Sequence, residues 1–261
     1  MNSFVRTTLG RFRRSFSRSS PNNTGKRLPP DLDDDFVELY RKNEAILGPF
    51  NSKLYTTYQT TKYVIDNNLP GDLVECGVYR GRQVVMMALT MMAFGEETKN
   101  IFLYDTFSGM TTPSEFDVKK HRVHASTFEK NLEHNHLMQR GGINLRCYTP
   151  IDEVKDAVYA SGYPSRRFKF IVGDVLNTLP NNFRTDIALL RLDTDWYEST
   201  RHELKHLYDK LTPLGALVID DYGSWEGQRK AVDEFFQRQK KKPFLARTSR
   251  AERVSIKTQF D

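Results

Sequence analysis

The chain has 261 residues, enough for one α/β domain with a full hydrophobic core. Hydrophobic residues make up 38% of the sequence, and no apolar run approaches the roughly 20 residues of a membrane-spanning helix. Two cysteines, Cys76 and Cys147, cannot build a disulfide framework, so we expect a cytoplasmic protein with reduced thiols.

The net charge of +6 is concentrated at the start of the chain. Residues 1–30 contain seven of the 39 basic residues and no acidic residue, which leaves 32 basic against 33 acidic residues elsewhere. The basic excess therefore belongs to an arm, and we expect no nucleic-acid binding by the body. We predict that the arm is poorly ordered and available for peripheral contact with a membrane, although its composition also resembles a transit peptide.

Residues 31–70 are expected to be helical. Acidic residues in the first turn of "DDDFVELYRKNEAI" favour a helix N-terminus, and "KLYTTYQTTKYVIDNN" continues to the turn signal Leu69-Pro70-Gly71. We predict that this segment is a lid that contributes to a substrate site. Packing of its tyrosines in the core is the alternative.

From Asp72 onward the sequence alternates short apolar runs with stretches of helical periodicity. The apolar runs predict strands at residues 72–76, 101–104, 168–172, 187–192 and 216–219. The other stretches predict helices at residues 83–94, 126–137, 151–159, 198–211 and 226–239. Two final β segments, at 244–249 and 253–259, indicate an antiparallel edge pair. This alternation is typical of a Rossmann-like α/β domain over residues 71–261, with a mostly parallel sheet and helices on both faces.

Three acidic residues follow two of the predicted strands. Asp193 comes directly after the run 187–192, and Asp220 and Asp221 come directly after the run 216–219. Parallel strands end at one edge of a sheet, where open α/β folds bind ligands, so we expect the three carboxylates to converge. Converging carboxylates repel one another unless a cation neutralises them, and oxygen ligands suit Mg²⁺ or another hard divalent ion. A solvated turn with surface acids is the alternative.

A second group of residues indicates a cofactor that contains a nucleoside. Gly77 and Gly81 follow the first strand, where glycine lets a ligand approach the backbone and the next helix points its positive N-terminus at that ligand. Glu75 stands at the end of the same strand. Asp105 ends the second strand, 24 residues after Gly81. At about this spacing an acidic residue commonly accepts hydrogen bonds from ribose hydroxyls.

The third strand completes this group. It ends in Gly173 and Asp174, where an adenine amino group would be recognised, and Phe107 is placed to stack on the base. The structural alternative makes Asp105 and Asp174 helix N-caps and Gly77 an ordinary turn residue. The cofactor interpretation is favoured because acidic residues end four strands: Glu75, Asp105, Asp174 and Asp193.

Between about Gly71 and Phe236 the chain resembles the macrocin O-methyltransferase family, S-adenosylmethionine-dependent enzymes with a class I methyltransferase fold. The resemblance is carried by "GDLVECGVYRG", "LYDTFSGM", "VGDVLNTLP" and "LRLDTDWYESTRHELKHLYDKLTPLGALVIDDYGSWEGQRKAVDEFF". It implies methyl transfer to a hydroxyl of a sugar or glycosylated small molecule, with a divalent metal. It also implies a homo-oligomer.

The resemblance implies roles for particular residues. By position, the metal ligands are Asp193, Asp220 and Asp221. The implied cofactor contacts are Glu75, Gly77, Tyr79, Gly81, Asp105 and Asp174. The sequence departs from the family at Arg82-Gln83, where a pair of small residues is usual, and either residue is a candidate for holding the methionine carboxylate. Asp193 and Asp195 are the two candidates for accepting the proton of the acceptor hydroxyl.

Two other functions compete with this interpretation. Asp193-Thr194-Asp195 is an Asp-x-Asp motif, which in a metal-dependent glycosyltransferase holds the metal on a nucleotide-sugar diphosphate. Binding of S-adenosylmethionine rather than of a UDP-sugar separates the two enzymes. The third possibility is a surface-binding protein without enzymatic activity, which would lose membrane affinity when residues 1–30 are deleted.

Overall fold

The computed structural model describes residues 28–119, 147–179 and 185–258, and the backbone of short strands at 123–124, 139–140 and 143–144. Residues 1–27 of the predicted arm and the predicted helix at 126–137 lie outside the described residues. Leu32–Asp261 form one unit, to which all elements below belong. Two small antiparallel strand pairs are separate from the main sheet and lie in the sequence between residues 105 and 168. They are β3 (Val118–Lys119) with β4 (Val123–His124), and β5 (Gln139–Arg140) with β6 (Ile143–Asn144).

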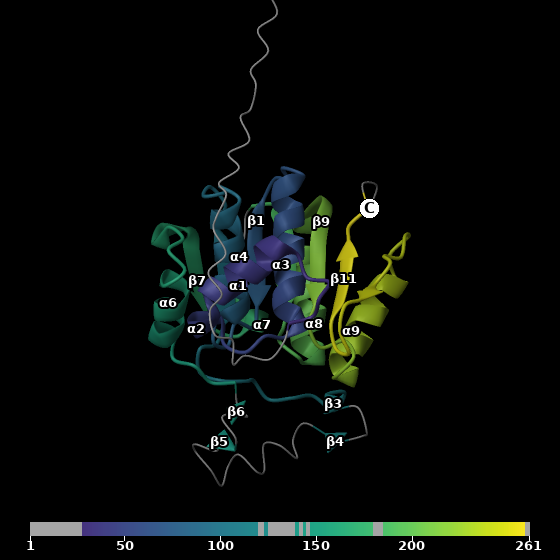
Figure 1. Cartoon of the computed structure of the whole chain (residues 1–261). Coiled ribbons are helices and arrows are strands. Elements are labelled where there is room, and N and C mark those ends of the chain that lie inside the picture. Colours follow the sequence, from purple (N-terminus) through teal and green to yellow (C-terminus); the bar gives the residue numbers. More distant parts are fainter. Residues whose placement is uncertain are drawn as a thin grey trace, which may run out of the picture. The chain divides into compact units, whose positions relative to one another are not determined.

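Seven strands form the central sheet in the spatial order β10-β11-β9-β8-β1-β2-β7 (Figure 1). The five parallel strands are β1 (Asp72–Cys76), β2 (Ile101–Asp105), β7 (Phe168–Val172), β8 (Ile187–Leu192) and β9 (Leu211–Ile219). Strand β11 (Arg253–Ile256) is antiparallel to both of its neighbours, β9 and β10 (Ala246–Arg247). The predicted α/β fold, with a mostly parallel sheet and an antiparallel C-terminal pair, is confirmed.

Strand β1 lies at the point where the strand order reverses. The chain runs outward from β1 through β2 to β7, then returns to β8 on the other side of β1 and continues to β9. Crossovers that leave in opposite directions open a crevice at the carboxyl ends of the strands, where α/β folds bind ligands. All residues of β1 and β8 are buried, and β8 accordingly reads as an apolar run, interrupted only by Arg191, rather than as an alternating pattern.

The helices form two layers, one on each face of the sheet. The first layer contains α1 (Asp34–Lys42), α2 (Glu44–Leu47), α3 (Ser52–Asp66), α4 (Arg82–Ala93) and α6 (Ile151–Tyr159). The second layer contains α7 (Val175–Thr178), α8 (Tyr197–Leu207) and α9 (Glu226–Gln237). Within the described residues, no helix is both long enough and apolar enough to cross a membrane.

Some predicted boundaries are wrong: the two final β segments are shorter than predicted, at Ala246–Arg247 and Arg253–Ile256, and the bounds of one helix and of the strand after it differ. The helix expected at 198–211 ends at Leu207, a 3-10 turn follows, and β9 begins at Leu211 rather than at Ala216. The sequence "LTPLG" reads as a turn, and Leu214 does adopt a left-handed φ of 67°. The neighbouring strand keeps this stretch in the sheet, because Leu214 N donates to Lys257 O (3.0 Å) and Lys257 N donates to Gly215 O (2.9 Å).

The N-terminal segment is helical, as predicted. It forms three helices, α1 to α3, that share an aromatic cluster. Phe36 of α1 is fully buried and lies within 4.9–6.1 Å, centroid to centroid, of four other rings: Tyr40, Phe50, Tyr55 and Tyr58. Because Tyr58 is also fully buried, it packs in the core rather than facing a ligand. The cluster fixes the position of the start of α3. This helix also carries a side chain of the candidate site described below.

Replacing Phe36 with alanine is expected to lower the free energy of unfolding by about 3–5 kcal/mol, because it removes the centre of this cluster and leaves a cavity. Urea unfolding followed by circular dichroism measures the change. Phe244→Ala is the matched control: this ring is 84% exposed, so its loss should change stability by less than about 0.5 kcal/mol. Equal effects of the two substitutions would contradict the assignment of the cluster to the core.

Candidate active site

A cavity of about 310 Å³ opens at the carboxyl ends of the five parallel strands. Residues that directly follow each of those strands line it: Gly77, Thr106, Gly173, Asp193 and Asp220. Side chains from outside the sheet, among them Lys53 of α3, complete the wall. The cavity therefore lies where the reversal of strand order predicts a ligand crevice.

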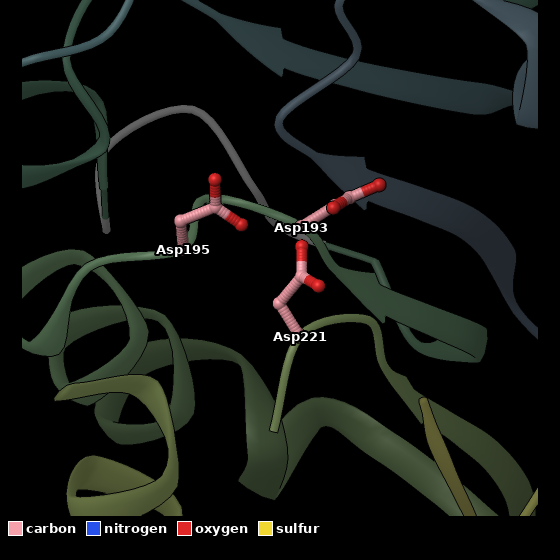
Figure 2. A group of neighbouring side chains, drawn as sticks. All are labelled: Asp193, Asp195 and Asp221. Carbon is pink, nitrogen blue, oxygen red and sulfur yellow. The ribbon is translucent and has the colours of Figure 1, made fainter. Parts of the chain in front are cut away.

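Asp193, Asp195 and Asp221 form an acidic cluster in this wall. One carboxylate oxygen of each lies within 4.8 Å of those of the other two, and Figure 2 shows the side chains coming from the loops after β8 and β9. The loop after β8 turns tightly, since Trp196 N donates to Thr194 O (2.7 Å) and Asp195 adopts a left-handed φ of 66°. Asp193 and Asp195 both follow β8, and this turn brings their side chains next to each other.

Asp220, the third predicted metal ligand, has other partners. Its carboxylate accepts a hydrogen bond from Nη2 of Arg191 and contacts Nζ of Lys53. Burial raises the pKa of Asp220, but the charges of Arg191 and Lys53 outweigh burial and hold it at about 2. Asp220 is therefore ionised and paired with two basic side chains.

The buried guanidinium of Arg191 joins carboxylates from four segments of the chain. Arg191 stands within β8 with no exposed surface. Its Nε donates to Oε1 of Glu75 (3.0 Å), its Nη1 to Oε2 of Glu252 (2.9 Å), and its Nη2 to Oδ2 of Asp193 (3.1 Å) as well as to Asp220. The guanidinium thereby fixes the ends of β1, β8 and β9 relative to the turn before β11.

Negative charge exceeds positive charge in this network. Burial, and then the charge of Asp220, raises the pKa of Asp193 well above its usual range. Burial, and then the charge of Asp221, does the same to the pKa of Asp195. Against the two basic side chains stand six carboxylates: Glu75, Asp193, Asp195, Asp220, Asp221 and Glu252. Excess charge on an all-oxygen donor set fits a hard divalent cation.

Sequence reasoning missed both basic residues of the network. Arg191 carried a signal, because a charged residue inside the apolar run "IALLRL" can be buried only with carboxylate partners. Lys53 carried none. It lies on α3, far along the chain from Asp220 and Asp221, and only the fold brings its Nζ to them.

The loop between β1 and α4 forms the opposite wall of the cavity. Gly77 has a φ of 83°, and a Cβ there would lie 2.2 Å from the carbonyl oxygen of Asp193, so this position requires glycine. Gly81, with a φ of 74°, precedes α4 and packs toward Val154 and Val158 of α6. Gly77 therefore lines the cavity, whereas Gly81 lies behind its wall.

Asp105 holds this loop in place. Its Oδ2 accepts from the backbone N–H groups of Val78 (2.7 Å) and Tyr79 (3.1 Å), and its Oδ1 accepts from that of Phe107 (2.7 Å). Tyr79 and Phe107 both have a left-handed φ of 50°, which the shared carboxylate stabilises. A carboxylate offers about four acceptor positions, so three are used within the protein and about one remains for a ligand hydroxyl.

The other predicted cofactor residues occupy distinct positions. Glu75 lines the cavity, and its buried Oε2 has no hydrogen-bond partner among the described residues; burial raises the pKa of Glu75 to about 8. Gly173 and Asp174 also line the cavity, and Asp174 caps α7 by accepting from Leu176 N (2.9 Å). The ring of Phe107 packs toward Phe170, with centroids 6.1 Å apart, outside the residues that line the cavity.

Arg82 and Gln83 connect α4 to the N-terminal helices. Arg82 Nη2 donates to the carbonyl oxygen of Pro49 (2.6 Å), and Gln83 Oε1 accepts from the hydroxyl of Thr57 (2.8 Å). Both side chains also line the cavity. Arg82 and Gln83, the pair at which the sequence departs from the family pattern, therefore connect residues 31–70 to the wall of the cavity.

Two solved structures described as methyltransferases have the same fold. The O-methyltransferase NovP superposes with a TM-score of 0.71 at 24% identity, over 86% of this chain and all of that one. The calicheamicin methyltransferase CalS11 superposes with a TM-score of 0.61 at 18% identity, over 92% of this chain and 99% of that one. Fold and cavity thus define a protein with a class I methyltransferase fold.

The family follows from the sequence comparison. The family model described as macrocin-O-methyltransferase (TylF) matches residues 50–247, so the chain belongs to this family of S-adenosylmethionine-dependent O-methyltransferases. The resemblance seen in the sequence motifs is confirmed.

Two curated relatives are O-methyltransferases, and the name of one of them includes a rhamnosyl group. The 8-demethyl-8-(2,3-dimethoxy-alpha-L-rhamnosyl)-tetracenomycin-C 4'-O-methyltransferase of Streptomyces olivaceus is 32% identical over 173 residues, which cover 66% of this chain and 60% of the relative. The demethyldecarbamoylnovobiocin O-methyltransferase of Streptomyces niveus is 30% identical over 186 residues, covering 70% of this chain and 64% of the relative. The chain thus matches less than two thirds of the length of these relatives.

Substitution of Asp105 by alanine is expected to weaken S-adenosylmethionine binding by roughly 1.5–3 kcal/mol, because the loop amides of Val78 and Tyr79 lose a charged acceptor and the ligand loses one as well. Isothermal titration calorimetry measures the change. Asp152→Ala, which removes an exposed carboxylate of α6, should leave the affinity unchanged. Wild-type affinity in a folded Asp105→Ala protein would contradict the role of this residue.

Proposed function

We propose that this chain is an S-adenosylmethionine-dependent O-methyltransferase that methylates a hydroxyl of a sugar or of a glycosylated small molecule. One observation carries the proposal: a single cavity joins the glycine loop, Asp105 and Asp174 to the acidic cluster. The loop and the two acids suit the methionine and nucleoside parts of the cofactor. The acidic cluster suits the reacting hydroxyl.

The family supports this function over the alternatives from the sequence. The region matched by the family model, residues 50–247, includes both the glycine loop and Asp193-Thr194-Asp195. The Asp-x-Asp motif is thereby accounted for without a glycosyltransferase. The named relatives methylate glycosylated compounds, which supports a glycoside as the acceptor class.

We assign the parts of the cofactor to the two sides of the cavity. Gly77 and the backbone of Tyr79 approach the methionine end, together with Arg82 or Gln83 for its carboxylate. Asp105 accepts from a ribose hydroxyl with its remaining acceptor position, and Asp174 faces the adenine. Glu75, whose Oε2 has no hydrogen-bond partner in the described part of the chain, is a further acceptor for the cofactor.

The reaction needs a proton acceptor beside the acceptor hydroxyl. The hydroxyl oxygen forms a bond to the methyl carbon, the carbon–sulfur bond breaks, and its electron pair stays on sulfur. The hydroxyl proton passes to a carboxylate of the acidic cluster, with Asp193 and Asp195 as the candidates because both line the cavity. Holding both reactants in one cavity makes the step effectively unimolecular.

The acidic cluster also suits a divalent metal ion, most simply Mg²⁺. Such an ion would act as a Lewis acid that lowers the pKa of the acceptor hydroxyl. We propose Asp193 and Asp221 as ligands, since both the resemblance and the geometry include them. The resemblance adds Asp220, whereas the geometry brings Asp195 to the pair and leaves Asp220 with Arg191 and Lys53.

Incubation with S-adenosylmethionine and a panel of glycosides tests the function. We expect mass spectrometry to detect the gain of one methyl group on a sugar hydroxyl and the formation of S-adenosylhomocysteine. Asp193→Asn should abolish transfer, because it removes both a candidate ligand and a candidate proton acceptor, while cofactor binding persists. Tight binding of a UDP-sugar together with no affinity for S-adenosylmethionine would favour the glycosyltransferase instead.

Calorimetric titration with Mg²⁺ tests the metal site without relying on turnover. Asp193→Asn and Asp221→Asn should each weaken Mg²⁺ binding by about tenfold or more, and Asp156→Asn on the exposed face of α6 should not. Comparing Asp195→Asn with Asp220→Asn identifies the third ligand. Excess EDTA should stop methyl transfer and leave cofactor affinity intact, whereas full activity in EDTA would contradict metal dependence.

A further inference from the structure

A second hollow, of about 270 Å³, lies beside the catalytic cavity and is rich in arginine. It is formed by the loop after β9, the start of α9 and the turn between β10 and β11. Of the charged residues that line it, one is acidic, Glu226, and four are basic: Arg229, Arg247, Arg250 and Arg253. Such a surplus of guanidinium groups around a concave surface is typical of sites for phosphate-type anions.

Two of the four arginines lie against one aromatic ring. The guanidinium carbons of Arg229 and Arg253 lie 5.4 and 5.1 Å from the ring centroid of Tyr222. The Tyr222 hydroxyl donates to Asp233 (2.6 Å), which also pairs with Arg229 (3.5 Å). Asp233, which is not part of the wall of the hollow, therefore balances the positive charge of Arg229. The positive charges of Arg247, Arg250 and Arg253 are opposed in the wall by Glu226 alone.

The backbone under the hollow is closely packed. Gly223 N donates to Ala251 O (2.8 Å), and a Cβ on Gly223 would lie 2.2 Å from the carbonyl oxygen of Arg250. Arg253 Nη1 donates to the carbonyl oxygen of Glu252 (2.8 Å). The carboxylate of Glu252 in turn binds the buried Arg191 of the catalytic site. The hollow is thus tied to the same network that positions the acidic cluster.

Arg253, the least exposed of the four arginines, has other positive charges beside it. Burial, and then the charges of Arg247 and Arg229, lower the pKa of Arg253. Like charges held together in this way are stabilised when an anion binds among them. The exposed Arg247 and Arg250 at the rim leave the hollow open to solvent.

A thin wall separates this hollow from the catalytic cavity. Asp221 lines the cavity, and the next residue, Tyr222, lines the hollow. Trp196 of the cavity wall meets Trp225 of the hollow edge to face, with ring centroids 4.9 Å apart. The two hollows therefore share the loop after β9 and lie next to each other.

We propose that the arginine hollow binds a phosphate or diphosphate group carried by the methyl acceptor. The acceptor is then a sugar linked to phosphate, such as a nucleoside diphosphate sugar, rather than a neutral glycoside. This assignment rests on the proposed methyltransferase function. Tyr222 and Trp225 add aromatic surface beside the anion, as a nucleoside attached to the phosphate would require.

Calorimetry with inorganic pyrophosphate tests the hollow without any turnover. We expect the wild-type protein to bind pyrophosphate and the double variant R247Q/R250Q to bind it about tenfold more weakly, with unchanged affinity for S-adenosylmethionine. R250Q alone is the second variant if the double variant loses stability. Arg166→Gln, an exposed arginine before β7 and away from the hollow, is the matched control and should behave as wild type. Equal pyrophosphate binding by wild type and R247Q/R250Q, or none by either, overturns the site.

Kinetics identify the source of the anion. For one hexose, KM should rise about tenfold in R247Q/R250Q when the hexose is linked to a nucleoside diphosphate and stay unchanged for its methyl glycoside. Pyrophosphate should compete with the diphosphate-linked acceptor. Pyrophosphate binding without such competition would show a separate anion site and overturn the assignment to the acceptor. No methyl transfer to any sugar would instead contradict the proposed function, and the calorimetry distinguishes this outcome from failure of the hollow itself.

Discussion

The burial of Arg191 is the constraint on which the site depends. A guanidinium cannot be removed from water without partners, so carboxylates must converge on it inside the sheet. Glu75, Asp193, Asp220 and Glu252 do so from the ends of three strands and the turn before a fourth. Removing one partner would leave charge unbalanced in a buried place, which typically costs about 3–5 kcal/mol. The network therefore fixes the position of the acidic wall of the cavity relative to the strands of the sheet.

The wall that we propose for the cofactor is built by a different interaction, between a side chain and the backbone. Asp105 accepts three amide N–H groups and so stabilises two non-glycine residues in left-handed conformations, Tyr79 and Phe107. Gly77 then fits within contact of the backbone of Asp193, which brings the two walls together. The proposed cofactor and acceptor sites are adjacent because these loops leave neighbouring strands at the point where strand order reverses.

The N-terminal helices and the arginine hollow extend the site on either side. Lys53 reaches the acidic wall from α3, whose start is fixed by the aromatic cluster around Phe36. On the other side, Glu252 links the arginine hollow to Arg191. Lys53 thus adds positive charge from outside the parallel sheet to the acidic wall, beside that of Arg191 in β8.

The sequence by itself determined the strands and the residues that end them. Short, mostly apolar runs located β1, β7 and β8, of which β1 and β8 are buried throughout, and the acids at their ends marked the cavity. Tertiary structure alone decided what those acids contact. It paired Asp220 with Lys53, turned Asp195 toward Asp193, and kept "LTPLG" within β9. These outcomes depend on groups far apart in sequence, whose meeting follows from the packing of the whole chain and not from any local pattern.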